Sequence, residues 1–195
     1  MQTAVMYSQP ANSPAKSKVY LSASFGPSFF GITDRSSYET YHFNGLGLQF
    51  DVDAGFALSR HLFMHFTYTG GLLSNPTIKV PNMYSPRPSD EISFNDRLTG
   101  GGFTWYPAKE FYLTLSAGAG LIKLNDKVNP EKSDSSERGP SFRIKVGREW
   151  KISERFGAGI CFTYGKTWTS NISYYYGEEK LTSNRFGFLC TVTMH

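Results

Sequence analysis

Residues 46–58 of the chain read LGLQFDVDAGFAL, a stretch in which apolar residues alternate with polar or small ones through all 13 positions. Successive side chains of a β-strand point to opposite faces, so Leu48, Phe50 and Val52 share one face and Asp51 lies on the other. Strands of soluble sandwiches usually have about 5 to 6 residues, whereas a tilted strand that crosses a membrane needs about 9 to 11. The stretch therefore predicts a strand of a tall barrel or of a membrane crossing.

The same period of two recurs in seven further segments, strictly in three of them and more loosely in four. The strict segments are residues 111–121, 141–151 and 156–168, and the looser ones are residues 19–30, 62–73, 93–106 and 184–194. In the segment 93–106, Leu98, Gly100 and Gly102 share one face, whereas Phe103 and Trp105 fall on the other. We expect a β-bulge at this point, because an extra residue shifts the phase of a strand.

Short and long polar connections alternate between these segments. The short breaks lie at residues 59–61, 107–110 and 151–155, and the long ones at roughly residues 33–44, 75–92, 125–139 and 171–182. An up-and-down sheet with short turns at one end and long loops at the other is the layout of an outer-membrane β-barrel. The sequence thus predicts an all-β fold, an eight-stranded antiparallel up-and-down transmembrane β-barrel with both termini on the short-turn side.

Length and composition agree with one β-rich domain. A chain of 195 residues suits a single closed sheet, and no stretch approaches the run of about 20 apolar residues that a spanning helix needs. The mean hydropathy of −0.35 is low, but lumen-facing residues dilute the average of a membrane strand. The net charge of +4 comes from scattered basic residues without a patch or motif, so we expect no nucleic-acid partner.

Residues 1–17 are expected to form a flexible tail that precedes a barrel domain over residues 18–195. This Ser, Pro, Ala and Gln-rich segment lacks the continuous apolar core of about 7 to 15 residues that a signal peptide carries. Export to an outer membrane requires such a peptide, so we interpret the sequence as a processed or trimmed form.

The polar faces of the predicted strands carry most of the strand charges, and the apolar faces are nearly devoid of them. The polar set expected in the lumen is Gln49, Asp51, Asp53, His65, Arg97, Arg143, Lys145, Glu149 and Arg185. A soluble lipocalin-like barrel would carry its apolar face inside, and the reverse arrangement would expose a large apolar girdle to water. We therefore expect the apolar face to contact lipid.

An eight-stranded barrel is only wide enough for its interior to be filled by side chains. We expect Asp51, Asp53 and Glu149 to pair inside it with the cations Arg143, Lys145, Arg97 and Arg185. The result would be a plugged, charge-paired lumen rather than a conducting pore or an apolar pocket. Arg148 falls on the outward face near a short turn, where its head should reach the interfacial region.

The two cysteines, Cys161 and Cys190, are expected to be free thiols. The alternation puts Cys161 on the face opposite to Ile160 and Phe162, whereas Cys190 shares a face with Phe188. Side chains on opposite faces of a sheet cannot form a disulfide bond.

Two of the stretches described above, GGFTWYP (residues 101–107) before a short turn and FGAGICFTY (residues 156–164) after one, resemble the small outer-membrane β-barrel, porin-like superfamily. Its members include opacity proteins, OmpX-like adhesins and the membrane domain of OmpA. The resemblance covers roughly residues 18–195 and is architectural. It implies a bacterial outer-membrane location, contact with outer-membrane lipids, insertion by the outer-membrane assembly machinery and a monomeric state.

Some members of this superfamily are lipid A acyltransferases or deacylases, so a catalytic set must be sought. His65 is the histidine expected inside the barrel, within reach of Asp51 or Asp53, but no G-x-S-x-G nucleophile motif is present. His42 and His61 show no paired metal-ligand spacing with the other histidines. We therefore predict no catalytic residue, no metal and no cofactor.

Tyrosines in the predicted loops are the candidates for recognition of an extracellular ligand, because exposed Tyr clusters are common on binding surfaces. They are Tyr38, Tyr41, Tyr174, Tyr175 and Tyr176. The alternative is that these tyrosines continue the strands above the membrane. The sequence favours a non-enzymatic structural or surface-interaction protein, against an outer-membrane lipid-modifying enzyme and, more distantly, a soluble lipocalin-like carrier.

Overall fold

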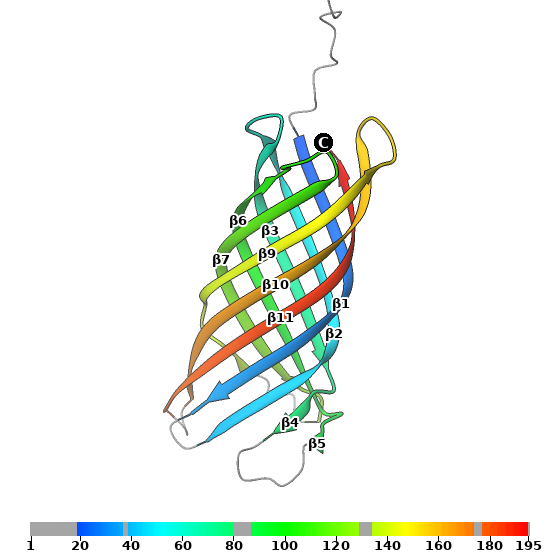
Figure 1. The fold of residues 1–195 in the computed structure, drawn as a ribbon. Helices are drawn as coiled ribbons and strands as arrows, with labels where there is room; N and C mark the ends of the chain where they lie inside the picture. The colour runs from blue at the N-terminus through cyan, green and yellow to red at the C-terminus, as the bar shows by residue number, and fades with distance from the viewer. Residues whose placement is uncertain (1–18, 37–38, 80–86, 129–133, 174–176, 195) are drawn as a thin grey trace, which may run out of the picture.

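The computed structural model describes residues 19–36, 39–79, 87–128, 134–173 and 177–194. Eight long antiparallel strands form a closed barrel (Figure 1). They are β1 (Val19–Arg35), β2 (Thr40–Ala57), β3 (Leu62–Ser74), β6 (Ile92–Trp105), β7 (Phe111–Asp126), β9 (Gly139–Lys151), β10 (Phe156–Ser173) and β11 (Gly177–Met194). The barrel closes because β1 pairs with β2 on one side and with β11 on the other. The predicted fold class is confirmed.

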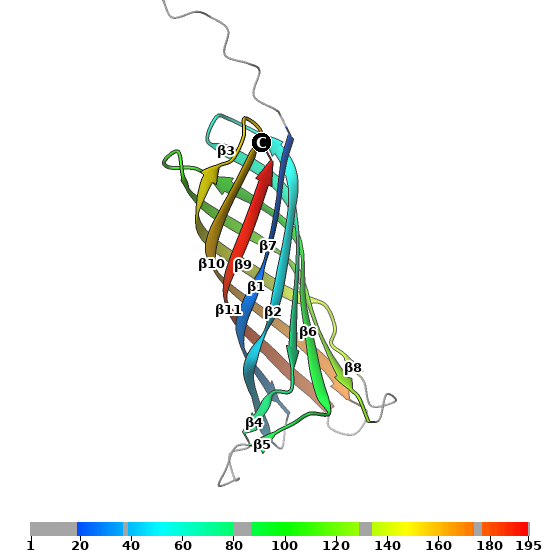
Figure 2. The same cartoon turned by 90° about the vertical axis from the view of Figure 1, so that its right-hand side faces the viewer.

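Three short strands extend the loop end of the barrel: β4 (Thr77–Lys79), β5 (Arg87–Pro88) and β8 (Asp134–Ser135). β4 pairs with β2, β5 pairs with β4, and β8 pairs with β7 (Figure 2). The described residues contain no helix long and apolar enough to cross a membrane.

The two ends of the barrel differ in their connections. Tight turns join β2 to β3, β6 to β7 and β9 to β10, and the start of β1 and the end of β11 lie at this same end (Figure 1). Backbone hydrogen bonds close two of the turns, from Leu58 N to Leu62 O at 2.9 Å and from Ile152 N to Phe156 O at 2.9 Å. Short turns face the periplasm in outer-membrane barrels, which orients the opposite end toward the outside.

Two of the four predicted long loops are mostly strand, so their predicted extent is wrong. β1 and β2 stay paired up to Arg35 and Thr40, and β10 and β11 up to Ser173 and Gly177. Thr and Tyr favour β-strands and pair well in a ladder that continues into water, yet such polar residues give a sequence the composition of a loop. The connections from β3 to β6 and from β7 to β9 remain the longer ones.

The outward face forms an apolar belt. Leu48, Phe50, Leu115 and Phe162 all point outward, with exposed fractions between 43% and 67% in the isolated chain. The residues between them on the same strands are buried in the interior. An apolar surface of this extent requires a lipid environment, since it would drive aggregation in water.

The orientation of β6 corrects two predictions. Arg97 was expected in the lumen but is exposed on the outward face, and Asp96 and Leu98 point inward instead. No bulge interrupts β6, because its register with β3 and with β7 is continuous from Ser93 to Trp105. The prediction failed because a lumen-facing Arg97 requires its neighbour Leu98 to face lipid, whereas the lumen at this level accepts apolar side chains.

A charge placed in the middle of the belt should destabilise the barrel. We expect Leu115→Arg to lower the free energy of unfolding by about 2–4 kcal/mol, since an arginine at the bilayer midplane must be desolvated. Urea unfolding of the protein in lipid bilayers measures the change. Thr182→Arg, outward but nearer the loop end, is the control and should cost about 0–1 kcal/mol; equal losses in both variants would contradict the assigned belt.

Candidate functional site

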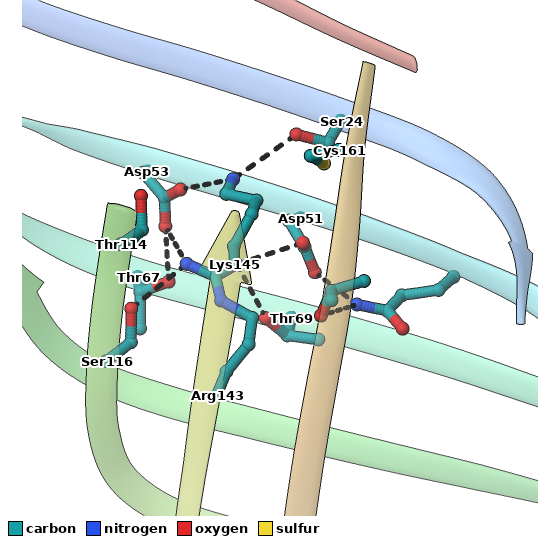
Figure 3. A network of polar contacts seen from close by, with 12 residues as sticks. Ser24, Asp51, Asp53, Thr67, Thr69, Thr114, Ser116, Arg143, Lys145 and Cys161 are labelled. Atoms are coloured by element: carbon teal, nitrogen blue, oxygen red, sulfur yellow. Dashed lines mark hydrogen bonds and ion pairs between the residues drawn. The ribbon is translucent and has the colours of Figure 1, made fainter. Parts of the chain in front are cut away.

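Ion pairs cross the middle of the barrel interior. Arg143 of β9 lies with its two terminal nitrogens 2.6 Å from Asp53 Oδ1 and 3.1 Å from Asp51 Oδ2, both on β2 (Figure 3). Lys145 Nζ lies 2.9 Å from Asp53 Oδ2. Counted along the long strands, β2 and β9 are four strands apart in either direction, so these contacts join opposite walls of the barrel.

Hydroxyl groups form further hydrogen bonds with these charges. Arg143 donates to Thr69 Oγ1 at 3.1 Å and to Ser116 Oγ at 3.0 Å, and the Thr67 hydroxyl donates to Asp53. Lys145 Nζ donates to Ser24 Oγ at 3.3 Å (Figure 3). The two cations and the two aspartates have no exposed side-chain surface. Buried charges are tolerated when they are paired and hydrogen-bonded in this way.

A second pair joins the other two walls closer to the loop end. Arg185 Nε on β11 lies 3.3 Å from Asp96 Oδ2 on β6, and these strands are again four apart in either direction. Arg185 also donates to the Asp96 carbonyl at 3.2 Å, and Thr167 donates to Asp96 Oδ1 at 3.1 Å. Two sets of ion pairs thus connect opposite walls of the barrel across the lumen. The polar groups in the middle of the lumen fill the space that water would occupy in a pore.

Aromatic side chains close the short-turn end of the interior. Tyr20, Phe63, Tyr106 and Tyr112 pack together there, with ring centroids 4.9 Å apart for Tyr20 and Phe63. The Tyr106 hydroxyl donates to Glu149 Oε2 at 2.8 Å. Glu149 was expected to meet a lumen cation, and its contact with Tyr106 is one that the charge pattern did not predict.

The outer third of the interior is apolar. Its buried cluster consists of Phe30, Ile32, Phe43, Leu73, Phe94 and Ile122. Beside it lies a small hollow, partly open to solvent, that is lined by polar and apolar residues, among them Asp34, Glu179 and Leu181. The outer third of the lumen is therefore filled mainly by apolar side chains, whereas the middle is charge-paired.

Eight of the nine residues predicted to face the lumen are buried there, and Arg97 is the exception. The buried ones are Gln49, Asp51, Asp53, His65, Arg143, Lys145, Glu149 and Arg185. Asp96 was missed because it lies in phase with the inward apolar residues Phe94 and Leu98. A count of charges on both faces of β6 would have flagged it, since one face carries Asp96 and the other Arg97.

His65 sits in an arrangement that has the order of a hydrolase triad. Thr104 Oγ1 lies 3.2 Å from His65 Nε2, and Asp53 Oδ1 lies 3.6 Å from His65 Nδ1. The second distance is too long for a hydrogen bond, and Thr104, at 0% exposure, contacts Thr114 Oγ1 at 2.9 Å. No substrate can approach such a buried hydroxyl, so the geometry fits a structural network.

Within the described part of the chain, no group of three or more His, Cys, Asp or Glu side chains is arranged to hold a metal ion. Cys161 is buried and Cys190 is exposed, and both are free thiols as predicted.

Arg148 points outward near its turn and pairs with Glu110 Oε2 at 2.6 Å, with its guanidinium over the rings of Phe111 and Trp150.

The predicted recognition tyrosines divide into two groups. Tyr41 lies on β2, not on a loop, and packs partly buried beside Phe43, with ring centroids 6.3 Å apart. Its hydroxyl donates to Glu39. Tyr38 and the run Tyr174, Tyr175 and Tyr176 lie outside the described residues.

No protein-family model and no curated protein matches the chain, but solved structures do. The outer membrane protein OprG from Pseudomonas aeruginosa aligns with a TM-score of 0.56 at 7% identity, over 92% of this chain and 97% of OprG. Neisserial surface protein A aligns with a TM-score of 0.51 at 12% identity, over 93% of this chain and 99% of that protein. The Escherichia coli outer membrane protease OmpT aligns with a TM-score of 0.51 at 8% identity, over 95% of this chain and 99% of OmpT. The chain therefore has the fold of bacterial outer-membrane β-barrels.

Removal of one member of the cross-lumen network should leave a buried charge without its partner. We expect Arg143→Ala to reduce the free energy of unfolding by about 3–5 kcal/mol, because Asp51 and Asp53 lose their shared cation. Arg148→Ala, which breaks the half-exposed pair with Glu110, is the matched control and should cost less than about 1 kcal/mol. Denaturant titration of both variants gives the comparison, and a neutral Arg143→Ala would show that the network does not hold the barrel together.

Proposed function

We propose that the protein is a non-enzymatic, monomeric outer-membrane protein that interacts with extracellular partners through strands that rise above the membrane. The observation that carries this proposal is the unequal length of the strands. β1 has 17 residues and β2, β10 and β11 have 18 each, whereas β7 has 16, β6 has 14, and β3 and β9 have 13. A membrane crossing needs only about 9 to 11 residues, so the four long strands have length to spare.

The four long strands are neighbours in the order β2, β1, β11, β10. They form one continuous part of the barrel wall (Figure 1). The outer ends of these strands carry polar residues on the outward face. Two of them are joined by a hydrogen bond of 3.1 Å between Thr33 Oγ1 and His42 Nδ1. An extended sheet of this kind supports a rigid recognition surface, since functional residues are commonly presented by loops on a fixed scaffold.

The tyrosine run at residues 174–176 joins the last two strands of this wall in the sequence. Three adjacent tyrosines supply large amphipathic contact area at little cost in side-chain entropy, which supports a role in recognition. Outer-membrane lipids and the assembly machinery are the further partners that we infer from the fold.

The likeness to OmpT keeps an enzymatic function as the alternative. Against catalysis stands the burial of the His65 and Asp53 side chains, both without exposed surface. Outer-membrane lipids and peptide substrates incubated with the purified protein should keep their masses. A new acylation or deacylation product would favour the lipid-modifying alternative, and a cleaved peptide would favour a protease.

Surface interaction is tested by binding of the purified protein, held in lipid nanodiscs, to arrays of glycans and extracellular-matrix proteins. We expect saturable binding to at least one array member and a loss of at least tenfold in affinity when the three tyrosines of residues 174–176 are replaced by serine. Tyr164→Phe, an outward substitution on the membrane-spanning part of β10, is the control and should bind like the unmodified protein. Absence of binding to every array member, or equal binding by the triple variant, would contradict the proposal.

Because its interior is filled, the protein should not conduct ions across a membrane. Eight strands leave too little room for an aqueous channel once the cross-lumen pairs are in place. Recordings across planar lipid bilayers should show no stable, large conductance steps after insertion of the protein. Long-lived open steps would mean that the network opens in the membrane and that the protein is a pore.

A further inference from the structure

Two exposed cations lie side by side on the outward face of the barrel, on β6 and β7. Arg97 is opposite Leu121 in the register of these strands, and Lys123 is opposite Asn95. Arg97 and Lys123 are therefore diagonal neighbours on the outward face. Asn95 lies on the same face, opposite Lys123 and two residues before Arg97. Diagonal neighbours in an antiparallel pair are within reach of long side chains, so both heads can contact one ligand.

Their height places them at the upper border of the apolar belt. On β7 the outward residues below Lys123 are Phe111, Leu113, Leu115, Ala117, Ala119 and Leu121. Lys123 is 12 residues above Phe111 on β7, and a tilted strand rises over that distance by roughly 30 Å, compared with an apolar band of about 25 Å. Arg97 is opposite Leu121, which is 10 residues above Phe111, a rise of roughly 25 Å. Lys123 thus lies just above the border and Arg97 lies at it.

Among the side chains that the structure describes, neither cation forms an ion pair, and Lys123 is opposite Ser135 of β8 on its other side. The ion pairs recorded there involve Arg143, Lys145, Arg148, Arg185 and His65, and none includes Arg97 or Lys123. Arg148, by contrast, has an anionic partner. Arg148 is also an outward arginine near a membrane border, at the short-turn end, and its charge is neutralised by Glu110 at 2.6 Å.

An outward arginine at the edge of the lipid belt can place its head in the interfacial region, where lipid phosphate groups are the available counter-charges. We propose that Arg97, Lys123 and Asn95 form a binding site for a phosphate group of the glycolipid in the outer leaflet, the lipid A part of lipopolysaccharide. The guanidinium offers a planar fork of donors that matches phosphate oxygens in a bidentate manner, and the lysine adds a point charge beside it. The Asn95 amide supplies a neutral donor on the same face.

The position of the site selects a lipid phosphate over a soluble anion. Arg97 lies opposite Gly70 of β3, over which the Phe50 ring packs, and opposite Leu121 of β7. An arginine stem can lie along such an apolar surface with its head in the interfacial region. The acyl chains of the bound glycolipid would cover the belt residues below, including Leu115. A free phosphate could not gain this second contact.

The inference is independent of the extracellular partner proposed above, because β6 and β7 lie outside the wall of long strands. Its test is a native mass spectrometry titration of the full chain in detergent micelles with lipid A. Three probes are compared: bis-phosphorylated lipid A, the same lipid after enzymatic dephosphorylation, and inorganic phosphate. The variants are the double substitution Arg97→Gln with Lys123→Gln and, as the matched control, Arg148→Gln.

We expect the unmodified protein and Arg148→Gln to bind phosphorylated lipid A with equal affinity, and the double variant to bind at least tenfold more weakly. Dephosphorylated lipid A should bind all three proteins as weakly as the double variant binds the phosphorylated form, and inorganic phosphate should not compete. Equal binding of phosphorylated lipid A by the double variant would overturn the site. Competition by inorganic phosphate at equal concentration would overturn the assignment to a lipid. Heat-modified migration on gels reports whether each variant is folded. If the double variant does not fold, single substitutions at Arg97 and at Lys123 replace it, and each is expected to weaken binding of phosphorylated lipid A.

Discussion

The ion pairs between Asp53 on one wall and Arg143 and Lys145 on the opposite wall are the contacts on which the rest of the barrel depends. Desolvation of such charges is costly, and it is offset here by two cations around one carboxylate and by hydroxyl groups that donate to Asp53 or accept from Arg143. Together with Arg185 and Asp96, they tie all four quarters of the barrel to each other across its axis. A closed sheet with a filled interior follows from these contacts.

A polar interior forces the apolar residues outward, because neighbouring positions on each strand point to opposite faces. The same alternation therefore specifies both the network inside and the lipid-facing belt outside. This inversion of the usual soluble arrangement explains how a chain with a mean hydropathy of −0.35 forms a membrane-spanning fold. The outer third of the lumen departs from the rule, since Phe94 and Leu98 point inward.

The sequence predicted those parts of the fold in which one face is charged and the other is apolar. β2 is the clearest case, and there the alternation alone assigns Asp51 and Asp53 to the lumen, where both are buried. β6 resisted the same reasoning because it carries apolar residues on both faces, which led to the wrong placement of Arg97. Loop lengths were overestimated because polar strands that rise into water have the composition of loops. Contacts that depend on three-dimensional closeness across the lumen, such as the one between Arg185 and Asp96, have no signature in the local sequence.

The central claim is that a charge-paired interior and a lipid-facing exterior alternate residue by residue along each strand. Spin labels attached one at a time along β7, from Tyr112 to Leu121, test it most directly in liposomes. The account predicts high collision rates with dissolved oxygen at Leu113, Leu115 and the other odd-numbered positions. At Thr114, Ser116 and the other even-numbered positions, it predicts low rates with both oxygen and a water-soluble relaxation agent. High accessibility to the water-soluble agent at the even-numbered positions, or oxygen contact without a period of two, would contradict it.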